Sequence, residues 1–154
     1  RYGADVQWLY GPGDGKLEWV GSHYDNLNNG TVSDALDVNG WYLSASHVLT
    51  GERKNRNKPI TPYAPFDPRT GAWGAWEVLG RFEQFLVQSG AFKTALATGT
   101  NRVDAITAGL TWWPNVHIKV MTDYVWSMFK DTVVSSGVGL DSEQLAQMRF
   151  QYDF

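Results

Sequence analysis

The densest group of charged side chains lies in residues 52–58, where basic residues follow one another closely: Arg53, Lys54, Arg56 and Lys58. Clustered bases raise the local concentration of small anions. A run of like charges is also typical of a turn that is merely solvated. The sequence leaves both interpretations open, an anion-attracting turn and a solvated basic turn.

Catalytic and metal-binding patterns do not emerge from the sequence. Ser46 and His47 are adjacent, and adjacent residues of a strand point to opposite faces, so they cannot act as nucleophile and base. The histidines lack the spacing of metal ligands, and the chain has no cysteine. Residues 25–39 are rich in Asn and Asp and could offer oxygens to Ca²⁺, but they lack the spacing of an EF-hand loop. We therefore expect neither an enzyme nor a cofactor or metal site.

Composition excludes other classes. The net charge of −3 gives no overall basic field for nucleic acid. No apolar run approaches the roughly 18 residues of a membrane-spanning helix, so this chain could cross a bilayer only as a closed barrel. The beginning of the chain shows no signal-peptide pattern. We expect residues 1–154 to be the C-terminal part of one β-barrel domain, without a second domain.

Period-two alternation is clearest in the last eleven residues, 144–154, where one face carries Ala146, Met148, Phe150, Tyr152 and Phe154. Such alternation predicts a strand with different surroundings on its two faces. Similar patterns predict strands at 4–10, 16–24, 40–50, 72–87, 102–113 and 116–130. Between them we expect turns at 11–15 and 113–115 and loops at 25–39, 51–71, 88–101 and 131–140, with a possible short helix at 91–97. The predicted class is all-β.

Strand length distinguishes a membrane barrel from a soluble sheet. Several predicted strands reach about ten residues, the length that crosses a bilayer at a tilt, whereas soluble strands are more often about five or six. Short turns alternate with longer loops, as in outer-membrane barrels, and the odd strand count implies at least one strand upstream. An antiparallel transmembrane β-barrel is favoured. A complete eight-stranded barrel with an adhesive or structural role and a soluble carbohydrate-binding β-sandwich remain alternatives.

Alternation also assigns side chains to faces. Charged residues of mixed sign share the polar face and would line a pore or brace its wall as cross-strand ion pairs: Glu77, Arg81, Glu83, Lys119, Asp123, Arg149 and Asp153. Aromatic residues share the other face and would form girdles at the membrane interfaces: Trp8, Trp19, Trp41, Trp76, Trp112, Tyr124, Trp126, Tyr152 and Phe154.

Four segments resemble the phosphate-selective porin O and P family in its order and spacing. Residues 40–53 (GWYLSASHVLTGER) resemble its "G-Y-Y-x-x-A-x-x-x-L-T-G-E" strand, and residues 71–82 (GAWGAWEVLGRF) its "G-A-W-E-x-x-x-R-Y/F" strand. Residues 105–124 are similar to its "T-x-G-L-N-W-Y" hairpin, and residues 149–154 to its closing strand. Thr111 departs from the usual Asn of the hairpin, and Pro114 shortens its turn.

The resemblance implies the C-terminal half, about seven to eight strands, of a sixteen-stranded and usually trimeric bacterial outer-membrane porin for small anions such as phosphate. It implies passive diffusion of small hydrophilic solutes and outer-membrane lipid around the barrel, and the net charge already argues against a nucleic-acid partner. The terminal Phe150, Tyr152 and Phe154 would then serve as the signal for the barrel-assembly machinery. A channel that works alone and one inside a larger envelope assembly both agree with it. The basic residues that select phosphate in the family lie largely upstream, so this chain's own anion preference does not follow.

Overall fold

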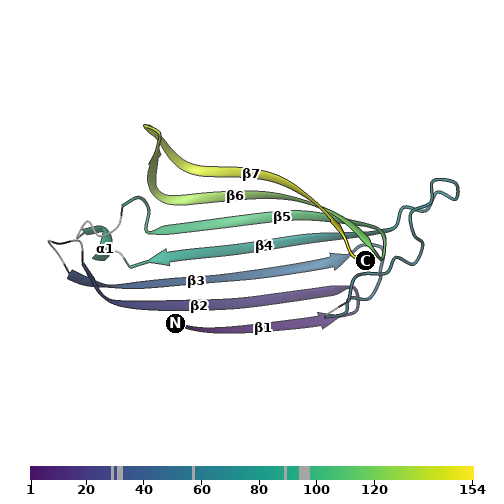
Figure 1. Cartoon of the computed structure of the whole chain (residues 1–154), viewed down its shortest axis with the longest axis horizontal. Helices are drawn as coiled ribbons and strands as arrows, with labels where there is room; N and C mark the ends of the chain where they lie inside the picture. The colour runs from purple at the N-terminus through teal and green to yellow at the C-terminus, as the bar shows by residue number, and fades with distance from the viewer. Residues whose placement is uncertain (29, 31–32, 57, 89, 94–97) are drawn as a thin grey trace.

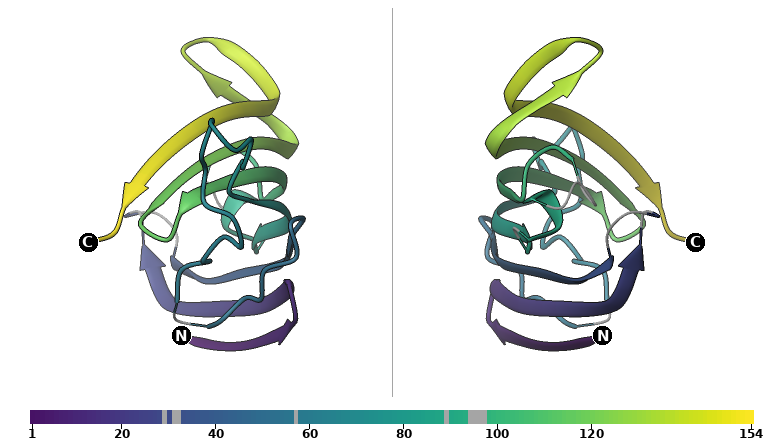
Figure 2. Two further views of the ribbon diagram at one scale, coloured as in Figure 1. Left: turned by 90° about the vertical axis from the view of Figure 1, so that its right-hand side faces the viewer. Right: turned by 90° about the vertical axis from the view of Figure 1, so that its left-hand side faces the viewer.

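The computed structural model describes residues 1–154 except 29, 31–32, 57, 89 and 94–97. It contains one short helix and seven strands: β1 (Tyr2–Tyr10), β2 (Gly13–Asn28), β3 (Ser33–Val48), β4 (Ala75–Val87), α1 (Gly90–Lys93), β5 (Arg102–Asn115), β6 (Ile118–Ser135) and β7 (Val138–Tyr152). Figures 1 and 2 show the strands side by side in chain order, and every neighbouring pair is antiparallel.

This arrangement confirms the all-β, antiparallel prediction. The β-sandwich alternative is wrong, because all seven strands belong to one sheet and no second sheet faces it in the described part of the chain. β1 and β7 form the two edges of that sheet and are not paired with each other.

Two predicted loops are wrong because strands continue through them. Most of residues 25–39 belongs to β2 and β3, where polar cross-strand pairs such as His23 with Asp37 replace the usual apolar alternation. Residues 29, 31 and 32 of that loop lie outside the described part. Residues 131–140 form the ends of β6 and β7 around a two-residue turn at Ser136 and Gly137, whose φ angles of 51° and 80° have the signs that a tight hairpin turn requires.

Smaller shifts affect the other connections. The predicted turn at 113–115 is part of β5, and the chain reverses one step later at Val116 and His117. Asn115 explains the shift, because its side-chain oxygen accepts hydrogen bonds from the backbone N–H groups of His117 and Ile118 at 2.8 and 3.0 Å. The predicted helix at 91–97 is observed as α1, with 94–97 outside the described residues.

The register gives the sheet two faces of different chemistry. We call the side that carries Asp14, Glu77 and Arg81 the polar face and the opposite side the apolar face. The apolar face carries every aromatic residue that we expected to form girdles within the strands, and its large side chains are widely exposed, with Leu17 at 41% and Ile106 at 45%. An apolar surface that extends over seven strands far exceeds what a monomer normally shows to water.

Aromatic contacts mark both ends of the apolar face. Near the end that holds the C-terminus, Trp76 stacks on Trp112 at 5.8 Å, and Phe66 meets Trp112 edge-on at 5.3 Å. Toward the other end, Trp41 contacts Phe82 at 5.3 Å.

Beyond Phe82 the same face turns polar. The indole N–H of Trp41 donates to Gln84 at 3.3 Å, and the Gln84 amide donates to Asp104 at 2.7 Å. The stretch of β4 from Trp76 to Gln84 therefore has about the nine to eleven residues with which a tilted strand crosses a bilayer.

The long connection between β3 and β4, residues 49–74, lies at the end of the sheet that holds the C-terminus (Figure 1). We call it the 49–74 segment. Its backbone is tied to the β1–β2 turn and to the end of β5, since Lys54 N–H donates to Gly11 at 2.9 Å and Phe66 N–H donates to Pro114 at 2.8 Å.

Two buried groups stabilise this segment from inside. Ile60 packs into a small core with Val48, Ala75 and Trp113. Glu52, only 3% exposed, accepts hydrogen bonds from the Thr50 hydroxyl and, at 2.9 Å, from the Tyr63 N–H. The segment is therefore an ordered part of the fold over its described residues. Among these residues, no helix combines the length and apolar character that crossing a bilayer would require.

Candidate functional site

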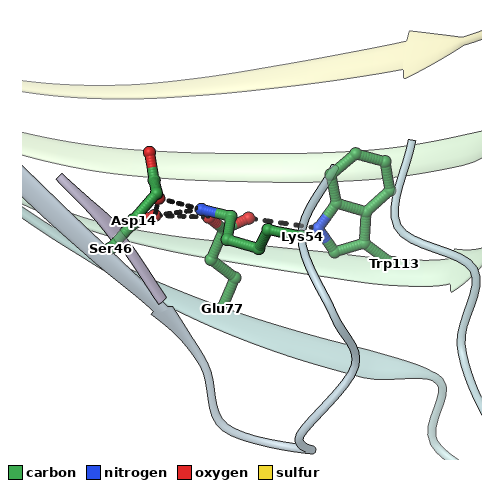
Figure 3. Close-up of polar contacts among 5 residues, drawn as sticks. All are labelled: Asp14, Ser46, Lys54, Glu77 and Trp113. Atoms are coloured by element: carbon green, nitrogen blue, oxygen red, sulfur yellow. Dashed lines mark hydrogen bonds and ion pairs between the residues drawn. The ribbon is translucent and has the colours of Figure 1, made fainter. Parts of the chain in front are cut away.

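The polar face holds a compact cluster around Lys54, which reaches from the 49–74 segment onto the sheet (Figure 3). The Lys54 ammonium bonds to the carboxylates of Asp14 in β2 and Glu77 in β4 and to the hydroxyl of Ser46 in β3. The indole N–H of Trp113 in β5 donates to the second oxygen of Glu77 at 3.3 Å. We call these five residues the Lys54 cluster. It links four neighbouring strands to the segment that joins two of them.

The charges in the Lys54 cluster are shielded from water. The side chains of Lys54, Asp14 and Glu77 are 14%, 21% and 13% exposed. At such burial an unpaired charge would be costly, so each group needs its partner. Ser46 accepts from Lys54, and its single proton can serve either carboxylate, at 2.8 Å for Glu77. One ammonium between two carboxylates makes this cluster an anchor and not a free cation.

A second group, further from the 49–74 segment, comprises Lys16, Glu18, Tyr42, Arg81 and Glu83. We call it the charge-paired belt. Lys16 contacts Glu18 at 2.7 Å, and Arg81 pairs with Glu83. The Tyr42 hydroxyl donates to Glu18 at 2.8 Å, while the Arg81 guanidinium lies 3.9 Å from the Tyr42 ring centroid. The buried Nε of Arg81 has no hydrogen-bond partner among the described residues.

The remaining wall candidates are more separate. Lys119 lies over the Trp113 ring at 4.9 Å, and Asp123 accepts a long hydrogen bond of 3.4 Å from Gln147. Gly109 makes room for Asp123, since a Cβ at Gly109 would lie 2.5 Å from that carboxylate. Arg149, on the edge strand β7, is exposed and has no ion-pair partner among the described residues.

The sequence-predicted wall residues thus share one face but do not act alike. Register places six of them on the polar face: Glu77, Arg81, Glu83, Lys119, Asp123 and Arg149. Glu77 belongs to the Lys54 cluster, and Arg81 and Glu83 belong to the charge-paired belt. Asp153 follows β7, where it accepts a hydrogen bond from the Gln151 amide at 2.9 Å.

The four basic residues of the 52–58 turn also differ in their surroundings. Arg53, Arg56 and Lys58 are exposed, whereas Lys54 turns onto the polar face and is neutralised there. Three of the four predicted anion-attracting residues therefore remain open to solvent at the end of the sheet.

The closing strand keeps its predicted alternation. Phe150 and Tyr152 lie on the apolar face, exposed to 66% and 56%, and Tyr152 stacks on Phe154 at 6.3 Å. The strand end is fixed by Asp153, whose N–H donates to the carbonyl of His117 at 2.8 Å.

Two earlier expectations concern metal ligands and the pair of Ser46 and His47. No group of three or more metal-binding side chains occurs among the described residues. Ser46 lies on the polar face and His47 on the apolar face, as the alternation predicted.

Sequence reasoning missed several members of both groups. Lys16, Glu18 and Tyr42 are not among the predicted wall residues, although Lys16 and Glu18 alternate with Leu17 and Trp19. That alternation is a signal that could have found them. Nothing in the spacing of Lys54 predicts that it leaves its basic neighbours to join Asp14.

A sheet with one apolar face between aromatic contacts and one charged face is characteristic of an outer-membrane β-barrel wall. The family model described as "Phosphate-selective porin O and P" matches residues 1–154, so the chain belongs to this porin family. It is similar to "Porin O" of Pseudomonas aeruginosa, with 24% identity over 156 residues that cover 99% of this chain and 35% of the relative. The chain therefore spans about a third of the length of the curated relative that it matches.

Proposed function

We propose that residues 1–154 form part of the wall of an outer-membrane porin, a passive diffusion channel for small hydrophilic solutes, within a single barrel domain. The apolar face would contact lipid, and the polar face would line a water-filled lumen. The observation that carries this proposal is the polarity of the two faces of β4. One face is apolar from Trp76 to Phe82 and becomes polar at Gln84, while the opposite face carries the charged residues Glu77, Arg81 and Glu83. Family membership supports it.

Two short turns guide our assignment of the direction of the barrel, although the longest connection, the 49–74 segment, lies at the same end as these turns. The turns β1–β2 and β5–β6, the 49–74 segment and the C-terminus share one end of the sheet, which we assign to the periplasm (Figure 1). Arg53, Arg56 and Lys58 would then face the periplasmic mouth and raise the local concentration of anions there. Phosphate is a candidate solute because the family description names it.

Assembly with other molecules completes the proposal. The exposed aromatic residues Phe150, Tyr152 and Phe154 would be read by the barrel-assembly machinery, and a homotrimer in the outer membrane would be the working unit. The exposed apolar face supports a lipid partner directly.

Reconstitution of the full-length protein tests the channel. Protein purified from outer membranes should migrate differently on gels before and after heating and should open discrete conductance steps in planar bilayers. A folded, heat-modifiable protein that adds no conductance would contradict the channel and favour a structural barrel.

A further inference from the structure

The charge-paired belt consists of two rows that cross β2, β3 and β4. In one row, Ser44 lies between Lys16 and Arg81, opposite both in the strand register. In the next row, Tyr42 lies between Glu18 and Glu83 in the same way. A basic row therefore lies beside an acidic row on the polar face. This geometry follows from the alternation of each strand, which places residues two positions apart on one face.

Each base of the belt is held by the acid of its own strand. Lys16 and Glu18 are in contact at 2.7 Å, and Arg81 pairs with Glu83. Tyr42 fixes the group from the middle, because its hydroxyl donates to Glu18 and its ring lies against both cations, at 5.4 Å for Lys16 and 3.9 Å for Arg81. The four ionised groups sum to zero over a short distance.

Solvent reaches all four charges. Their side chains are between 32% and 38% exposed, so an unpaired base here would project its field into the surrounding water. Among the residues that the structure describes, the rest of the polar face supplies no basic excess. The register adds Lys119 and Arg149 against Asp5, Asp14, Glu77, Asp123 and Glu143, with Lys54 reaching in from the 49–74 segment. Because the other charges of this face do not sum to a basic excess, the paired bases of the belt are the ones whose release would add to anion attraction across β2, β3 and β4.

We propose that Glu18 and Glu83 determine the charge selectivity of this part of the lumen by cancelling Lys16 and Arg81. The wall formed by this chain then does not concentrate anions, and small cations and neutral solutes pass it as readily. This inference deepens the proposed channel function and rests on it. It assigns the anion attraction of residues 1–154 to the exposed bases of the basic turn.

A charge-pair cycle in the full-length protein tests the inference. Reversal potentials across a KCl gradient in planar bilayers give the anion-to-cation permeability ratio of each variant. Glu83→Gln should raise this ratio about two-fold, the effect of one unit charge several Å from the ion path in salt-screened water. Arg81→Gln should lower it by about the same factor, and the double variant should return to the wild-type ratio.

The second pair repeats the test if the first variants fold poorly. Glu18→Gln should raise the anion-to-cation ratio, and Lys16→Gln should lower it. Asp25→Asn is the matched control, because it removes the same charge from β2 at a site that is 77% exposed and whose ion pair, among the described residues, is with His23. Its ratio should stay at the wild-type value.

The outcomes separate the inference from the channel itself. A conducting protein in which neither Glu83→Gln nor Glu18→Gln shifts the ratio, while Arg81→Gln lowers it, would show that Arg81 attracts anions freely and would overturn the inference alone. A folded wild-type protein without conductance would overturn the channel and, with it, the inference.

Discussion

Replacement of Lys54 by Met should loosen the 49–74 segment while leaving the sheet intact. Met keeps much of the side-chain volume and removes the ammonium that lies between Asp14 and Glu77. The two carboxylates then repel each other without compensation. The backbone bonds of the segment to Gly11 and Pro114 and the ladders of the sheet do not involve this side chain.

The magnitude lies between two limits. Removing one partner of a fully buried ion pair costs about 3–5 kcal/mol, whereas exposed pairs contribute about 0–1 kcal/mol. Lys54 is 14% exposed and has two acidic partners, so a cost of about 2 kcal/mol is reasonable between these limits. Since 1.4 kcal/mol is a factor of about ten, the open population of the segment should rise roughly 30-fold.

Hydrogen exchange of the folded protein in detergent measures this opening directly. Amides of the 49–74 segment should exchange faster in Lys54→Met, and chymotrypsin should cut faster after Tyr63, which is 73% exposed. Lys58→Met is the control, since Lys58 is an exposed base of the same segment. Adding Asp14→Asn and Glu77→Gln to Lys54→Met should slow exchange again by removing the repulsion. Equal exchange in the Lys54 and Lys58 variants would refute the role given to this cluster.

Further outcomes can be checked separately. Gly109→Ala should lower thermal stability by about 1–3 kcal/mol through overpacking, whereas Gly80→Ala, where a Cβ meets nothing within 4 Å, should be tolerated; similar melting temperatures would argue against the packing. Deletion of Phe154 should reduce outer-membrane levels more than single-channel conductance, and normal surface levels would contradict its part in assembly. Neutralising the exposed bases Arg53, Arg56 and Lys58 should lower the anion-to-cation permeability ratio in planar bilayers. An unchanged ratio would count against the anion-attracting turn.

Alternation made the sheet predictable. Strand β7 shows why, because each residue from Ala146 to Tyr152 reports its face by its polarity, and the structure places these side chains as expected. The same rule placed Glu77, Arg81 and Glu83 together, since alternate residues of one strand must share a face. Sequence reasoning thus predicted the fold class and the shared face of these three charged residues.

Where alternation fades, the prediction fails. Strands β2 and β3 continue beyond Trp19 and Trp41 with Asp, Asn and Ser on both faces, so composition resembled a loop there. Lys54 could not be placed either. Its position depends on how the 49–74 segment folds over three strands, through the buried Glu52 and Ile60, and these contacts have no periodic signal.

The Lys54 cluster also has a consequence for folding order. Its members come from positions 14, 46, 54, 77 and 113, so it can form only after four strands have found their partners. A slip of one residue in β2, β3 or β4 would turn its side chain to the apolar face and leave the ammonium without that partner, and a slip of β5 would take the Trp113 indole from Glu77. Closure of the 49–74 segment should therefore be a late step that succeeds only on a sheet in the correct register, so that the cluster distinguishes a correctly assembled wall from a slipped one.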